Sequence, residues 1–148
     1  MGADPTLRER AVALLARRDH SRAELARKLA RHAESAADVE SVLDDLARRE
    51  LLSDERFAAG RGEALGRRFG AGRVVRELRG KGVAPAALAA VANDLKGSEL
   101  ARAREVWQKR FGVLAGSAAE RARQARFLQS RGFPYDVIRR VVRGLEDE

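Results

Sequence analysis

Cysteine is absent from this chain of 148 residues, and its two histidines are His20 and His32. Without thiolates the chain forms neither a disulfide nor a cysteine-ligated zinc or iron–sulfur site. The histidines belong to no motif that places further ligands beside them. We therefore predict no metal site and no cofactor. His20, directly before Ser21, is expected in a turn, and His32 at the end of a helix.

Long apolar runs are also missing, and aromatic residues are few. No run approaches the roughly 18 residues that cross a bilayer, and the N-terminal segment lacks the apolar stretch of a secretory signal. We expect a soluble, cytoplasmic protein without a membrane partner. Aromatic residues make up 5% of the chain. Phe57, Trp107 and Phe111 are expected in the core, because large apolar side chains on helical stripes are usually buried.

Catalytic motifs are missing as well. The sequence has no HExxH, GxSxG or P-loop segment. Adjacent carboxylates such as Asp54 and Glu55 point about 100° apart on a helix, so we expect a first-turn or solvated position and no acid–base pair. Gly70-Ala71-Gly72 is expected to be a flexible turn, because no strand precedes it as in a phosphate-binding loop. We expect no catalytic residues and no enzyme.

What the chain does contain is an apolar pattern that occurs three times. The copies, at offsets of 49 and 50 residues, are Leu29/Val39/Val42/Leu46, Leu78/Leu88/Val91/Leu95 and Leu128/Ile138/Val141/Leu145. A fixed period indicates a tandem array of similar units that complete one another's cores. The sequence predicts an all-α fold of three tandem three-helix modules, at residues 1–50, 51–98 and 99–148. The modules are expected to form an elongated, curved helical-repeat array.

Helical spacing and end signals place the individual helices. Apolar residues recur at i, i+3, i+4 and i+7. Hydroxyl residues three positions before an acid mark helix starts at Thr6/Glu9, Ser21/Glu24, Ser117/Glu120 and, more weakly, Ser35/Asp38. Gly82 and Gly132 each follow a basic residue and are expected as left-handed glycines that end helices. The predicted helices are residues 7–18, 22–31, 36–49, 54–68, 72–80, 85–95, 99–114, 118–131 and 134–146.

The net charge of +8 is unevenly distributed. Residues 1–50 contain 10 Lys and Arg against 10 Asp and Glu, residues 51–98 contain 9 against 5, and residues 99–148 contain 11 against 7. The second and third modules therefore carry +4 each. Attraction to a polyanion or an acidic partner is expected there.

Some of the positive residues recur in register with the repeat. Arg27, Arg76 and Arg126 each lie two residues before a core leucine and are expected to face outward. If the modules stack in one sense, equivalent residues form a row along the array. The candidate residues for binding a partner or DNA are Arg67, Arg68, Arg73, Arg76, Arg79, Lys81, Arg123, Arg126, Arg131, Arg139 and Arg140. The alternative is an ordinary solvated face, partly paired as in Arg73/Glu77.

Four segments follow one another along the repeats: Leu14–Leu29, Leu52–Ala58, Arg76–Gly82 and Arg126–Phe133. In order and spacing they resemble the RecX family of bacterial regulatory proteins. The resemblance covers roughly residues 11–145. It implies an all-α, curved array that binds the RecA recombinase filament on single-stranded DNA. It also implies that binding lowers the filament's ATPase, strand-exchange and coprotease activities, which moderates recombination and the SOS response.

Together these observations favour a monomeric, non-enzymatic modulator that docks along a RecA filament through arginines of the second and third modules. Direct contact with the DNA backbone is compatible with the same residues. One alternative is a helix-turn-helix-like DNA-binding regulator, with Arg73, Arg76 and Arg79 near the groove. Another is a helical-repeat scaffold for an unrelated partner.

Overall fold

The computed structural model describes residues 3–144, which are all-helical as predicted. Over this range the chain forms nine α-helices and no strand. They are α1 (Leu7–Arg17), α2 (Arg22–Ala30), α3 (Ala36–Arg48), α4 (Asp54–Gly66), α5 (Ala71–Gly80), α6 (Pro85–Lys96), α7 (Glu99–Arg110), α8 (Ala118–Ser130) and α9 (Tyr135–Arg143). No helix of the described range is long and apolar enough to cross a membrane.

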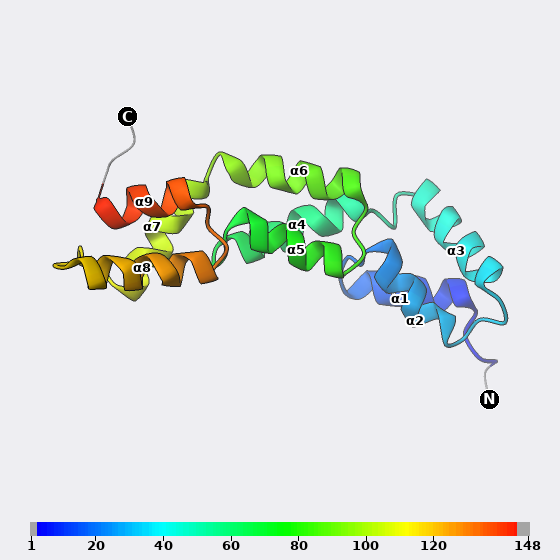
Figure 1. Ribbon diagram of the computed structural model, residues 1–148. Helices are drawn as coiled ribbons and strands as arrows, with labels where there is room; N and C mark the ends of the chain where they lie inside the picture. Colours follow the sequence, from blue (N-terminus) through cyan, green and yellow to red (C-terminus); the bar gives the residue numbers. More distant parts are fainter. Residues whose placement is uncertain (1–2, 145–148) are drawn as a thin grey trace.

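The helices form three successive modules, which are α1–α3, α4–α6 and α7–α9 (Figure 1). Each module encloses its own cluster of buried apolar residues. Phe57 lies in the core of module 2, as predicted. In Figure 1 the modules form an elongated row, with module 1 at one end and module 3 at the other. The predicted tandem array is therefore confirmed.

The repeated apolar pattern lies in these cores. The leucines of the second helices, Leu29, Leu78 and Leu128, are completely buried. The third-helix positions are buried too, except Val42, which is half-buried. Leu145, the last predicted position, lies outside the described residues. Burial of one leucine side chain stabilises the folded state by about 1.5–3 kcal/mol. Because the same apolar positions occur in each module, each module forms a similarly packed core.

Polar caps begin and glycines end several of these helices. Five hydroxyl side chains accept a hydrogen bond from the amide three residues on: Thr6, Ser21, Ser35, Ser53 and Ser117. At α1 the Glu9 carboxylate also accepts from the Thr6 amide, which completes a capping box. Gly82 and Gly132 follow the ends of α5 and α8 with φ of 76° and 91°, as predicted for left-handed glycines.

Module 3 differs from the predictions in three respects. Helix α9 ends at Arg143 and not at residue 146, because the chain turns at Gly144, whose φ is 72°. Helix α7 ends at Arg110 and not at residue 114, because the chain turns at Gly112, whose φ is 70°. Trp107 and Phe111 were expected in the core but are half-buried. Phe111 packs edge to face on Phe127, with 5.4 Å between the ring centroids. These aromatic side chains therefore lie at the border between core and surface.

Candidate binding surface at the junction of modules 2 and 3

Adjacent modules are joined by a contact that the repeat builds twice. At the first junction, the Ser21 hydroxyl at the start of α2 donates a hydrogen bond of 2.8 Å to the Lys81 carbonyl after α5. At the second, the amide of Gly70, the N-cap of α5, donates at 2.8 Å to the Arg131 carbonyl after α8. Both pairs occupy equivalent positions of the repeat. The second helix of one module thus meets the second helix of the next.

A carboxylate completes the first junction. Asp54, the first residue of α4, accepts hydrogen bonds of 2.8 Å from the amides of Arg22 and of Ala84. These amides lie at the starts of α2 and α6, where helix ends leave unpaired donors. Asp54 therefore links modules 1 and 2. Its predicted first-turn position is correct, but this contact was missed, because Arg22 is 32 residues away along the chain.

Glu99, the first residue of α7, has the same role at the second junction. Its buried carboxylate accepts from the Ala71 amide at 3.2 Å and pairs with Arg102 at 2.5 Å. Arg102 in turn donates to the carbonyls of Gly66 and Phe69, each at 2.7 Å. These bonds hold the segment after α4 against module 3 and so fix the position of Phe69.

The close approach at this second junction requires glycine. A Cβ atom on Gly70 would lie 2.3 Å from the Gly132 carbonyl oxygen, and one on Gly132 would lie 2.5 Å from Arg73 Cβ. No L side chain fits such distances without displacing the backbone. The prediction of a flexible turn at Gly70-Ala71-Gly72 is wrong, because Gly70 is buried in a contact between two modules.

Guanidinium groups and aromatic rings alternate across this junction. The Arg73 guanidinium carbon lies 4.0 Å from the centroid of the Phe69 ring. Arg131 lies between two rings, 5.4 Å from that of Phe69 and 5.1 Å from that of Phe127. Arg110 follows at 5.5 Å from the Phe127 ring. We call these five residues the arginine ladder, which cation–π contacts hold together.

Further groups extend the ladder over module 2. Arg68 lies 5.2 Å from the Phe69 ring. The Arg73 side chain also donates a 3.0 Å hydrogen bond to the Ser130 carbonyl. Arg76 lies beside them, and together with Arg73, Glu77 and Ser130 it lines an open depression of about 410 Å³. The junction therefore presents several guanidinium groups in fixed positions.

The ladder arginines have no acidic partner in the described range. No ion pair among residues 3–144 involves Arg68, Arg73, Arg110 or Arg131. The predicted Arg73/Glu77 pair is not formed, because Glu77 pairs with Arg61 at 3.7 Å. A guanidinium group that is stacked on a ring is already oriented, and its N–H edge suits phosphate and carboxylate groups. This surface can therefore bind anions with little further ordering.

The other predicted binding residues lie around the ladder or apart from it. Arg67 pairs with Glu63 on its own helix at 3.5 Å. Arg123 pairs in the same way with Glu120 at 3.6 Å. Exposed positions are occupied by Arg76, Arg79, Arg126 and Arg139, and half-buried ones by Lys81 and Arg140. Of the whole predicted set, Arg68, Arg73 and Arg131 are brought together around one ring.

Arg110 is the functional candidate that sequence reasoning missed. One local signal was present, because Arg131 follows Phe127 of α8 by four positions, whereas Phe69 precedes α5 and has no helical spacing to Arg73. Side chains at this spacing meet on a helix surface. The contact of Arg110 with Phe127 joins two helices and has no such signal.

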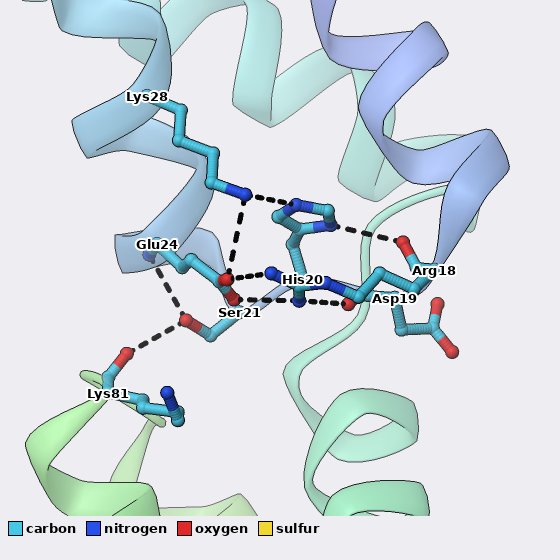
Figure 2. Close-up of polar contacts among 7 residues, drawn as sticks. All are labelled: Arg18, Asp19, His20, Ser21, Glu24, Lys28 and Lys81. Carbon is cyan, nitrogen blue, oxygen red and sulfur yellow. Dashed lines mark hydrogen bonds and ion pairs between the residues drawn. The ribbon is translucent and has the colours of Figure 1, made fainter.

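His20 is buried between α1 and α2, although its connecting position matches the expected turn (Figure 2). The Lys28 ammonium group lies 2.9 Å from Nε2, which must accept because an ammonium group only donates. Nδ1 therefore carries the proton and donates to the Arg18 carbonyl at 3.0 Å. Desolvation lowers the pKa of His20. The ring is a neutral bridge in the structure, and within residues 3–144 no cluster of metal-ligating side chains occurs.

An elongated array of three-helix modules defines a helical-repeat protein. Residues 8–46 match the family profile described as the first three-helix domain of RecX, and residues 98–142 match its third. The regulatory protein RecX of Leptothrix cholodnii is 48% identical over 97% of this chain and 91% of its own length. That of Ralstonia nicotianae is 44% identical over 95% and 89%. The chain therefore belongs to the RecX family.

Solved structures share the fold. The crystal structure of RecX from Lactobacillus salivarius has a TM-score of 0.79 over 94% of each chain, at 16% sequence identity. A second crystal structure of a regulatory protein RecX has a TM-score of 0.74 over 91% of this chain and 72% of that chain, at 19% identity. At these identities the likeness concerns the fold, and it agrees with the tandem arrangement.

Proposed function

We propose that this chain is a non-enzymatic regulator that binds the RecA recombinase filament on single-stranded DNA. Binding lowers the ATPase, strand-exchange and coprotease activities of the filament and so moderates recombination and the SOS response. Membership of the RecX family supports a regulatory role. The observation that carries the proposal is the arginine ladder, whose guanidinium groups are oriented and lack acidic partners in the described range.

The shape of the array suits such a partner. A helical nucleoprotein filament repeats phosphates and acidic side chains along a groove, and an elongated array can contact several repeats at once. The proposed interface extends from the ladder and Arg68 to the other predicted basic residues, which are Arg67, Arg76, Arg79, Lys81, Arg123, Arg126, Arg139 and Arg140. Guanidinium groups bind phosphate as well as carboxylate, so contact with the DNA backbone belongs to the same proposal.

The proposal also includes the organisation of the chain. We assign the module boundaries to residues 1–50, 51–98 and 99–148, so that each module keeps its three helices. Leu52, just after the first boundary, packs in the core of module 1. The protein acts as a soluble, cytoplasmic monomer. Inhibition involves no chemistry, so the amount of protein required is stoichiometric with its filament sites and not catalytic.

Filament binding by two matched double variants tests the interface. Arg68→Glu/Arg110→Glu reverses two exposed charges on aromatic rings of the junction. Arg27→Glu/Lys96→Glu makes the same change in charge at exposed helical positions away from it. Fluorescence anisotropy of labelled single-stranded DNA coated with recombinase should show at least about tenfold weaker binding for the first variant. The control should stay within about twofold of the wild type, with circular dichroism confirming that both variants are folded.

Equal binding by the two variants would show that the ladder is not the interface. Duplex DNA without recombinase should bind much more weakly than the coated strand. If the duplex bound as tightly as the coated strand, the helix-turn-helix alternative would replace the filament proposal.

A further inference from the structure

Charge in module 1 is segregated, although residues 1–50 are neutral overall. Five of its arginines form ion pairs with carboxylates of the same module: Arg8, Arg18, Arg22, Arg48 and Arg49. Four other arginines of the module, Arg10, Arg17, Arg27 and Arg31, form no ion pair within residues 3–144, and neither does His32. The local excess of positive charge therefore depends on where these four arginines lie.

Three of these arginines, Arg10, Arg17 and Arg31, line one groove between α1 and α2, of about 680 Å³, together with His32. Arg27 is not among its lining residues. Lys28 lines it as well, and its ammonium group is shared between Glu24, at 3.8 Å, and the His20 ring. Glu9 is the carboxylate among the lining residues, and it accepts from the Thr6 hydroxyl at 3.1 Å in the helix cap. The groove is therefore rimmed by cations whose charge the protein itself leaves largely uncompensated.

The floor of the groove is apolar. Ala13 and Leu14 of α1 and Leu29 of α2 line it, and Pro5 closes one end. Ala13 is exposed and Leu14 half-buried, so apolar surface is open to solvent between the charged side chains. A concave apolar seat with a few convergent polar groups is the usual form of a ligand site.

We propose that this groove binds an acidic peptide segment that carries an apolar side chain. Carboxylates of the segment pair with the cations of the rim, and its apolar side chain lies on Ala13 and Leu14. A nucleic-acid strand would satisfy the rim, but its aliphatic groups are limited to thymine methyls and sugar carbons. A leucine-sized side chain of a protein segment can cover more of the apolar floor, so a protein segment fits the groove better. Module 1 lies at the opposite end of the row from module 3 (Figure 1), so this contact is separate from the arginine ladder and independent of the proposed function.

Anisotropy with a short fluorescein-labelled peptide of Glu and Asp around two leucines tests the groove on the full chain. Arg17→Glu/Arg31→Glu reverses two exposed rim charges. Lys96→Glu/Arg121→Glu makes the same change in charge at exposed positions of modules 2 and 3 that lie outside the proposed filament interface. We expect at least about tenfold weaker peptide binding for the rim variant and less than about twofold for the control. Ala13→Glu, which fills the floor at an exposed helical position, should abolish binding and keeps the test decisive if the rim variant does not fold.

Three results would overturn the proposal. If the rim and control variants weakened peptide binding equally, the loss of binding would reflect the change in net charge and not the groove. Undiminished binding of a peptide with glycines in place of the leucines would exclude the apolar seat. A single-stranded oligonucleotide that displaced the peptide and lost affinity with the rim variant would make the groove a nucleic-acid site.

Discussion

His20 ties the stability of module 1 to pH. Desolvation lowers the pKa of His20 below its ordinary value of 6.5, so the unfolded chain binds more protons than the folded chain between the two pKa values. Stability is therefore fully present above about pH 6.5 and is lost as the pH falls from there through the folded-state pKa. Protonation would also remove the acceptor for Lys28. The loss of folding stability at low pH is therefore attributed to the buried His20 ring.

Urea denaturation at about pH 7.5 and about pH 5.5 measures this effect. The wild type should lose more stability between the two pH values than His20→Gln, which has no titrating group. His32→Gln, at an exposed position, is the matched control for the histidine-to-glutamine change itself. Glu24, close to His20, contributes little to the difference. Desolvation of its carboxyl is outweighed by the hydrogen bond from Arg18, which keeps the pKa of Glu24 below its ordinary value of 4.5. If His20→Gln lost as much stability as the wild type, the ring would not titrate in this window.

Individual helices depend on how closely they meet their neighbours, and α4 offers a direct comparison. A Cβ atom on Gly60 would meet nothing within 4 Å, whereas one on Gly62 would lie 2.9 Å from Val91 Cγ1 in α6. Alanine is favoured over glycine in a helix by about 0.5–1 kcal/mol. Gly60→Ala should therefore stabilise the protein by about that amount, and Gly62→Ala should destabilise it because Val91 must move. Thermal denaturation of both variants distinguishes these results, and equal shifts would contradict the close packing of α4 on α6.

The start of α4 carries the second prediction at this scale. Asp54→Ala leaves the amides of Arg22 and Ala84 without their partner. Arg22 is half-buried and Ala84 exposed, so water replaces part of each lost contact. The variant should be destabilised by about 0.5–1.5 kcal/mol, the usual net contribution of a hydrogen bond. Hydrogen exchange should accelerate first at these two amides. Glu55→Ala, at the exposed neighbour, should change stability by no more than about 0.5 kcal/mol. If the hydrogen-exchange rates of both amides were unchanged in Asp54→Ala, Asp54 would not link the two modules.

At the scale of the whole molecule, the distribution of charge predicts how filament binding responds to salt. Arg76 and Arg126 are exposed in the two modules of charge +4, whereas Arg27 is exposed in the neutral first module. Arg76→Glu/Arg126→Glu should weaken binding to recombinase-coated DNA more than Arg27→Glu does. Exposed charges are screened by salt, so wild-type affinity should fall steeply with added salt and that of the double variant less steeply.

A salt series with all three proteins, with circular dichroism as the folding control, measures this dependence. Such exposed substitutions usually shift stability by only about 0.5 kcal/mol. A folded double variant that bound like the wild type at every salt concentration would favour the solvated-face alternative. A larger loss with Arg27→Glu would move the interface to module 1.

Much of the fold follows from local sequence. The apolar pattern around Leu29, Leu78 and Leu128 predicted three modules, and the hydroxyl caps and the glycines at 82 and 132 predicted most helix ends within two residues. These features act over one or two helical turns, so neighbouring residues suffice to specify them. The end of α7 was predicted too late, because the residues after Arg110 continue a helical pattern up to the turn at Gly112.

The sequence by itself determined the helices, the triple repeat and the excess of positive charge in modules 2 and 3. Only the tertiary structure decided that Asp54 reaches Arg22, that Arg110 and Arg131 share the Phe127 ring, and which cations of the neutral module remain unpaired. The physical reason is that each of these contacts joins helices whose relative position depends on backbone approach. At Gly70 that approach leaves no room for a Cβ atom, and no count of charges or residue spacing specifies such a distance.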